Sequence, residues 1–198
     1  MRQNTGFKDD EYVIISDGLS YRIAQLIENH KNNYLVKLAN NLKKIKLNQL
    51  IYPIEPTIAA QIEKINHIMT EIDIQLLYEL MNDESRLTIR ELAILYFGEQ
   101  VTILQMTSLL FKLAAEETLF HNYQDGSFRK CSTEEQTLRK KIAAKQQYQL
   151  EQFNHYHNLF LTAFTDGKLI TDLDIDIFKS LYKPDKHSPS YKALQHIT

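Results

Sequence analysis

The periodicity of the apolar residues changes near residue 54, and this change divides the chain. Before it, short β-branched and aromatic runs alternate with polar turns, a pattern typical of strands. After it, apolar residues recur every three or four positions, which predicts helices. Pro53 and Pro56 mark the border. We therefore predict an α+β fold, mostly helical, with domains at 1–54, 55–131 and 132–198.

The first part is expected to be a small β-barrel with a basic surface. Its strands are predicted at residues 11–15, 21–27, 34–38, 43–46 and 50–54. Closing the sheet into a barrel would remove its exposed edges. The stretch from Gly18 to Ile54 contains one acid, Glu28, and six basic residues: Arg22, Lys31, Lys37, Lys43, Lys44 and Lys46. The local charge is thus +5, whereas the whole chain carries −2.

The second part shows helical segments followed by a hairpin signal. The helices are predicted at residues 57–69, 74–81, 89–97 and 103–117. Asp73 is placed to cap one helix, and Thr88 with Glu91 forms a capping box for another. Asp125–Gly126 is typical of a hairpin turn. Helices followed by a hairpin, in this order, predict a winged-helix-like segment in which the hairpin is the wing.

The charge of this segment argues against duplex-DNA reading. In helix-turn-helix folds a recognition helix usually enters the DNA groove. Residues 55–100 contain nine acids against Lys64, Arg86 and Arg90. A phosphate-reading helix concentrates Lys and Arg instead. We therefore favour a winged helix used for packing or spacing.

The third part is expected to contain a long helix and C-terminal helices. Ser132 with Glu135 forms a capping box that opens the long helix toward Phe164. Its first half is polar, and an aromatic stripe follows: Phe153, Tyr156, Phe160 and Phe164. A looser tail is predicted at residues 183–190, and the ending at 193–198 is also expected to be loose.

No complete active site is evident in the sequence, so we predict no catalytic and no metal-ligating residues. Asp172, Asp174 and Asp176 alternate with apolar residues and fit a helix start better than a calcium loop. His155 and His157 point to different faces of a helix, which makes them poor co-ligands. Phosphate-loop, serine-elbow and dinucleotide motifs are missing from the sequence.

The composition indicates a cytoplasmic protein. Cys131 is a single cysteine, which excludes an internal disulfide framework and fits a reducing compartment. The N-terminus is polar and does not resemble a signal peptide. No apolar run approaches the roughly 20 residues of a membrane helix, so we expect no membrane partner.

Two patches are candidates for binding RNA, since basic grooves with aromatic platforms bind single strands. The candidate residues on the barrel are Tyr21, Arg22, Tyr34, Lys37, Lys43, Lys44 and Lys46. Those on the wing are Tyr123, Arg129 and Lys130, beside Phe120 and Phe128. The alternative for both patches is ordinary: solvated lysines and aromatic residues in the core of a sheet.

From Leu87 onward the chain resembles a known family. The segments are Leu87–Gly98, Leu109–Leu110, Glu117–Phe120 and Gly126–Arg129, followed by a charged helix. They resemble the N-terminal, pre-catalytic region of ribonuclease II-type exoribonucleases (the RNB family), especially the divergent branch of cyanobacteria and plastids. The tail Pro189–Leu194 resembles the stretch before the catalytic domain.

The resemblance implies an accessory role rather than catalysis within this chain. It implies that the region guides single-stranded RNA to a hydrolytic 3′→5′ exonuclease domain of the same polypeptide. The magnesium of such enzymes belongs to that domain, so no cofactor is expected here. Two alternatives stay open. One is a protein-docking module that uses the aromatic stripe, and the other is a winged-helix DNA-binding regulator.

Overall fold

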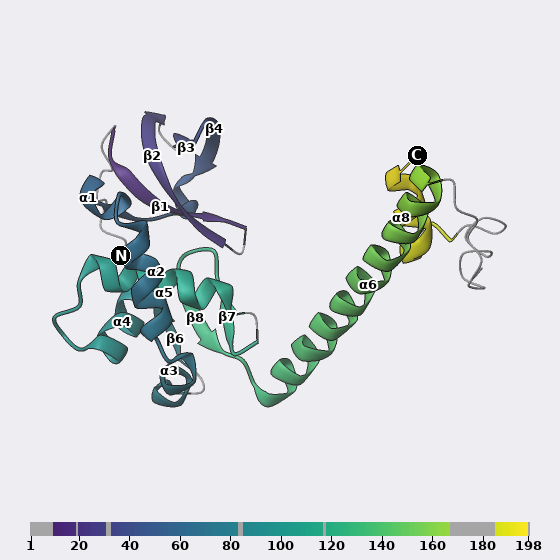
Figure 1. Cartoon of the computed structure of the whole chain (residues 1–198). Coiled ribbons are helices and arrows are strands. Elements are labelled where there is room, and N and C mark those ends of the chain that lie inside the picture. The colour runs from purple at the N-terminus through teal and green to yellow at the C-terminus, as the bar shows by residue number, and fades with distance from the viewer. Residues whose placement is uncertain are drawn as a thin grey trace. The chain divides into compact units, whose positions relative to one another are not determined.

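The computed structural model describes residues 10–18, 20–30, 33–82, 85–116, 118–166 and 185–197. The fold is α+β with antiparallel sheets (Figure 1). It consists of two compact units, one ending at Gln136 and one beginning at Thr137.

All five strands predicted in the first part are present and form one antiparallel sheet. They are β1 (Tyr12–Asp17), β2 (Ser20–His30), β3 (Asn33–Leu38), β4 (Asn41–Lys46) and β5 (Leu50–Ile54), with a 3₁₀ turn, η1 (Leu47–Gln49), before β5. The order is β4-β3-β2-β1-β5. Register shifts at Ile14/Ile15 and at Leu26/Glu28 mark bulges, which bend a sheet.

The predicted closed barrel is wrong for the part of the chain that the structure describes. The two edge strands, β4 and β5, do not pair with each other there. The chain leaves β5 directly into a helix that begins at Pro56. The free edge at β4 carries exposed lysines, a common protection against edge-to-edge association. The sheet therefore needs no closure to protect its edges.

Both faces of the sheet are buried at β1. Val13 and Ile15 contribute to a core on one face, whereas Ile14 contributes to a core on the other. The first core is built from the sheet alone: Val13, Ile15, Ala24, Leu26, Tyr34, Val36, Ile45 and Leu50. The second core joins the sheet to the helices, through sheet residues such as Tyr21 and Ile54.

Five helices follow the sheet in the same unit. They are α1 (Pro56–Ala59), α2 (Ile62–Glu71), α3 (Ile74–Leu80), α4 (Ile89–Phe97) and α5 (Ile103–Ala115). The single helix predicted at 57–69 is divided between α1 and α2 by Ala60 and Gln61. The cap at Asp73 and the capping box at Thr88 are confirmed.

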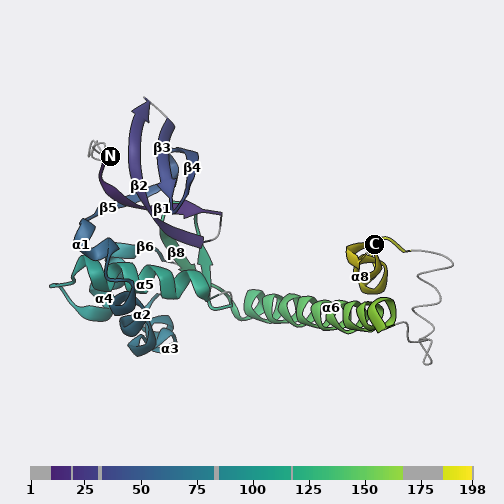
Figure 2. The ribbon, with the colours of Figure 1, turned by 45° about the horizontal axis from the view of Figure 1, so that its top comes forward.

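Helix α5 lies at the centre of this unit. It packs against α2, α4 and β2, with the sheet on one side and the helices on the other (Figure 2). Leu109, Leu110 and Leu113 are fully buried. The hydroxyls of Thr107 and Ser108 are also buried and donate to carbonyl oxygens one turn earlier in the helix. Tyr52 of β5 donates to Thr107, so the sheet is hydrogen-bonded to α5.

A second sheet contains the predicted hairpin and one further strand. Its strands are β6 (Arg86–Thr88), β7 (Phe120–Asn122) and β8 (Ser127–Lys130), in the order β6-β8-β7. The turn at Asp125–Gly126 is confirmed, with Gly126 at φ +76°. A Cβ at Gly126 would lie 2.8 Å from Cγ2 of Ile51, so only glycine fits there. Strand β6 was not predicted, because three residues are too few for an alternating pattern.

The second unit contains most of α6 (Thr133–Asp166) and α8 (Pro189–Ile197). Ser132 and Glu135 form the predicted capping interactions at the start of α6. Tyr156 and Phe160 are buried against Ala193 of α8. Helix α8 fits the predicted C-terminal helices, but the looser structure predicted at 183–190 and 193–198 is wrong where α8 includes these residues, because its apolar residues pack on the aromatic stripe. The Phe164 side chain and the Asp172, Asp174 and Asp176 run lie outside the described residues.

Candidate nucleic-acid interface

Three lysines of the five-stranded sheet share one exposed face. Lys37 of β3 and Lys44 and Lys46 of β4 are exposed. The register pairs Leu35 with Lys44 and Lys37 with Leu42. Directly paired residues lie on the same face and alternate residues share it, so all three lysines project to one side. None of them forms an ion pair with a described residue. We call this surface the lysine face (Lys37, Lys44 and Lys46).

Lys43 lies on the opposite face of the sheet, because its partner in the register is the buried Val36. Its Nζ lies 2.6 Å from Oδ1 of Asp17, and Nε of Arg22 lies 3.2 Å from Oδ2 of the same carboxylate. The hydrogen bond from Lys43, with its charge and that of Arg22, lowers the pKa of Asp17. Asp17 therefore stays ionised and offsets one of the two positive charges.

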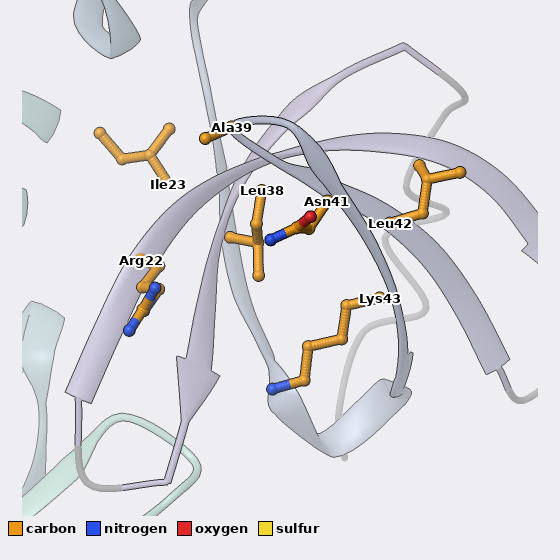
Figure 3. A pocket seen from close by; sticks show the side chains of 7 residues that line it. All are labelled: Arg22, Ile23, Leu38, Ala39, Asn41, Leu42 and Lys43. Carbon is orange, nitrogen blue, oxygen red and sulfur yellow. The ribbon is translucent and has the colours of Figure 1, made fainter. Parts of the chain in front are cut away.

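A pocket opens beside this ion pair, at the end of the sheet where β2 runs past the β3–β4 turn (Figure 3). Its volume is about 480 Å³, and its lining consists of Arg22, Ile23, Leu38, Ala39, Asn41, Leu42 and Lys43. Figure 3 shows the Lys43 side chain extending from β4 toward the side of Arg22, with Leu38 between the two residues. Asp17 itself was not predicted as a site residue.

The two tyrosines predicted on the barrel are buried, each with 7% of its surface exposed. Tyr34 belongs to the core on the inner face of the sheet. The hydroxyl of Tyr21 lies 2.5 Å from Oδ1 of Asn122 and 3.0 Å from the carbonyl oxygen of Tyr123. Burial raises the pKa of Tyr21, against an opposing effect of the Asn122 hydrogen bond. Neither ring offers a free stacking surface, and Tyr21 instead connects the sheet to the hairpin.

The basic residues predicted on the wing are engaged within the protein. Both Nη atoms of Arg129 donate to the carboxylate of Glu135, at 3.0 and 2.8 Å. This bidentate pairing is the main cause of a raised pKa for Arg129. Lys130 is buried, and its Nζ lies 4.6 Å from the centre of the Tyr78 ring. Arg129 and Lys130 therefore secure the start of α6 and the hairpin, and they are not placed as free phosphate contacts.

Tyr123 is covered by a residue that sequence reasoning did not select. The Arg86 guanidinium lies 3.9 Å from the centre of the Tyr123 ring. Arg86 also donates to Asp125 and Ser127, both at 2.6 Å. Burial would raise the pKa of Asp125, but hydrogen bonds from Ser127 and Arg86 outweigh it and lower that pKa. The signal for this network was absent from the sequence, because Arg86 reaches the turn only through the pairing of β6 with β8.

The described residues contain no group of three or more His, Cys, Asp or Glu side chains that could hold a metal ion. Cys131 is buried. No helix among the described residues is both long and apolar enough to cross a membrane.

Comparisons with protein-family models, with curated proteins and with solved structures found no match for this chain.

Proposed function

We propose that the first unit is an RNA-contacting module that holds single-stranded RNA by its phosphates along the lysine face. The observation that carries this proposal is the alignment of Lys37, Lys44 and Lys46 on one side of two paired strands. Two residues along a strand span about 7 Å, so Lys44 and Lys46 present two separate cations along β4. The contrast with the net charge of −2 of the whole chain supports a local role for these cations.

The lysine face lacks aromatic rings for base stacking, which are the second element of a surface that binds single strands. Its apolar residues are Leu35 and Leu42, and both predicted tyrosines lie elsewhere. Without aromatic stacking, binding rests on phosphate neutralisation and depends strongly on salt. For single strands the slope of log K against log salt is about 0.7 per phosphate neutralised. Three lysines therefore correspond to a slope contribution of about 2.

The test is a salt titration of oligo(U) binding to the whole chain. In the variant Lys37→Gln/Lys44→Gln/Lys46→Gln, the slope should fall by about 2. A matched control is Lys140→Gln/Lys141→Gln/Lys145→Gln, which removes the same charge from the exposed part of α6.

A slope that falls only in the first variant supports the lysine face as the RNA site. Equal losses in both variants would show a diffuse charge effect and refute the proposal. So would the absence of binding at low salt.

The wider context of this role is proposed from the resemblance. The segments from Leu87 to Gln152 resemble the pre-catalytic region of RNB-type exoribonucleases, and a cytoplasmic location fits that role. In this proposal the strand leads to a catalytic domain outside this chain, and the magnesium belongs to that domain. The order α2, α3, β6, α4, α5, β7, β8, with β8 between β6 and β7, supports a winged-helix-like arrangement of this segment.

A protein-docking role is the second candidate, and one observation favours it. The predicted docking stripe is partly used internally, since Tyr156 and Phe160 are buried against α8. Other apolar side chains of α6 are exposed instead: Leu138, Ile142, Tyr148 and Leu150. Leu138 and Ile142 lie one turn apart on the same side of the helix and form an apolar patch there, a feature of interaction surfaces.

A photo-crosslinker at position 138 tests this second candidate. Position 147 lies nine residues further along the helix and therefore faces the opposite side, which makes it a matched control. In the cell, position 138 should give a discrete adduct that position 147 does not. Equal yields at both positions would argue against docking.

Duplex-DNA reading gains no support from the packing of α5. The helix contacts β2 on one side and α2 and α4 on the others, and Thr107 accepts a hydrogen bond from Tyr52. A recognition helix must present one face to the groove. That face of α5 is covered here by the five-stranded sheet.

A further inference from the structure

We infer that the pocket beside the Arg22–Asp17–Lys43 cluster binds the phosphate of one nucleotide, with the base against Leu38. The identity of the ligand as a nucleotide rests on the proposed RNA role. Phosphate recognition at the pocket rests on the geometry of the pocket itself. The two cations of the pocket lie on the opposite face of the sheet from the lysine face.

The cationic side of the pocket is pre-organised by Asp17. Each carboxylate oxygen holds one cation, at 2.6 Å for Lys43 and 3.2 Å for Arg22. This arrangement uses Nε of Arg22, and no described residue accepts a hydrogen bond from its Nη atoms. Two cations and one carboxylate leave a net charge of +1 at the pocket. The free fork of Arg22 matches a phosphate group in geometry as well as charge.

Both cations can be reached by a ligand. The side chain of Arg22 is 59% exposed and that of Lys43 is 43% exposed. Figure 3 shows the two side chains on either side of Leu38. A phosphate can therefore contact both cations without displacing either from Asp17.

The remaining lining suits the rest of a nucleotide. Leu38 supplies an apolar surface between the two cations, and Asn41 offers an amide that can donate and accept. The volume of about 480 Å³ lies within the usual range of small-molecule sites, roughly 300–1,000 Å³. A bare phosphate would leave Leu38 uncovered, so a nucleotide should bind more tightly than inorganic phosphate.

The experiment is a titration of the ¹⁵N-labelled whole chain with AMP, adenosine and inorganic phosphate, followed by amide shifts. AMP should shift the amides of residues 38–43 most, inorganic phosphate less, and adenosine least. The variant Arg22→Gln/Lys43→Gln should bind AMP at least tenfold more weakly. The matched control, Lys140→Gln/Lys141→Gln, removes the same charge from an exposed part of α6 and should bind AMP as the wild type does. Unchanged shifts far from the pocket show that each variant is folded.

Three results would overturn the inference. They are equal losses in both variants, adenosine binding as tight as AMP binding, and no shifts with AMP at about 10 mM, a concentration tenfold above a millimolar dissociation constant. The two proposals fail separately. RNA binding that depends on the lysine face but no AMP binding refutes only the pocket. AMP binding at the pocket without binding of oligo(U) refutes only the RNA role.

Discussion

Replacing Tyr21 by phenylalanine tests how firmly the five-stranded sheet is attached to the hairpin. The hydroxyl of Tyr21 lies 2.5 Å from Asn122 Oδ1 and 3.0 Å from the Tyr123 carbonyl oxygen. The variant keeps the ring and removes only this donor. Leaving a buried acceptor without its donor costs about 1–3 kcal/mol. For a protein of this size, each kcal/mol lowers the melting temperature by about 2–4 °C.

The measurement is guanidinium unfolding followed by far-ultraviolet circular dichroism, since the chain has no tryptophan. Tyr148→Phe is the matched control, because Tyr148 is 62% exposed. We expect Tyr21→Phe to lower the unfolding free energy by about 2 kcal/mol and the control by less than about 0.5 kcal/mol. Hydrogen exchange should also accelerate in β7 and β8. Equal, small effects of both substitutions would refute the hydroxyl's role in attaching the sheet.

Three further substitutions have expected outcomes. Gly126→Ala should lower the free energy of unfolding by about 1–3 kcal/mol more than Gly98→Ala does. Both positions have positive φ, but only Gly126 has a side-chain atom within 4 Å of the added Cβ. Equal losses in denaturant unfolding would contradict the contact. Burial raises the pKa of Tyr52 despite its hydrogen bond, so its contribution to stability is present below about pH 10, where unfolded tyrosine ionises, and is lost above it. Tyr52→Phe should therefore flatten the alkaline fall in stability, and an unchanged slope would argue against this burial. Phe160→Ala should unfold α8, since a helix of this length is only marginally stable in water when it is not docked. Cα chemical shifts that stay helical over 189–197 would disprove the docking.

The caps, turns and strands of the first unit follow from local sequence. Asp73 and Thr88 act as caps where they were predicted, and Asp125–Gly126 forms the expected turn. These features depend on interactions between residues close in sequence, which a pattern records directly. The looser structure predicted at 183–190 and 193–198 was misjudged where α8 forms, because this helix depends on packing against Tyr156 and Phe160.

The candidate site was only partly predictable. Residue types gave the basic character of residues 18–54, but not which lysines share a face. That division depends on the register, which pairs Lys43 with the buried Val36 and Lys44 with Leu35. The role of Asp17 in holding Arg22 and Lys43 likewise arises only when β1, β2 and β4 are brought together.

The sequence by itself determined most of the strands and helices and the excess of positive charge near the N-terminus, because these follow from neighbouring residues and composition. Only the tertiary structure decided what each side chain does. It buried Tyr21 and Tyr34, paired Arg129 with Glu135, and left Lys37, Lys44 and Lys46 exposed on one face. The physical reason is that burial and charge pairing depend on which strands and helices meet, and residues distant in the chain carry no local record of that meeting.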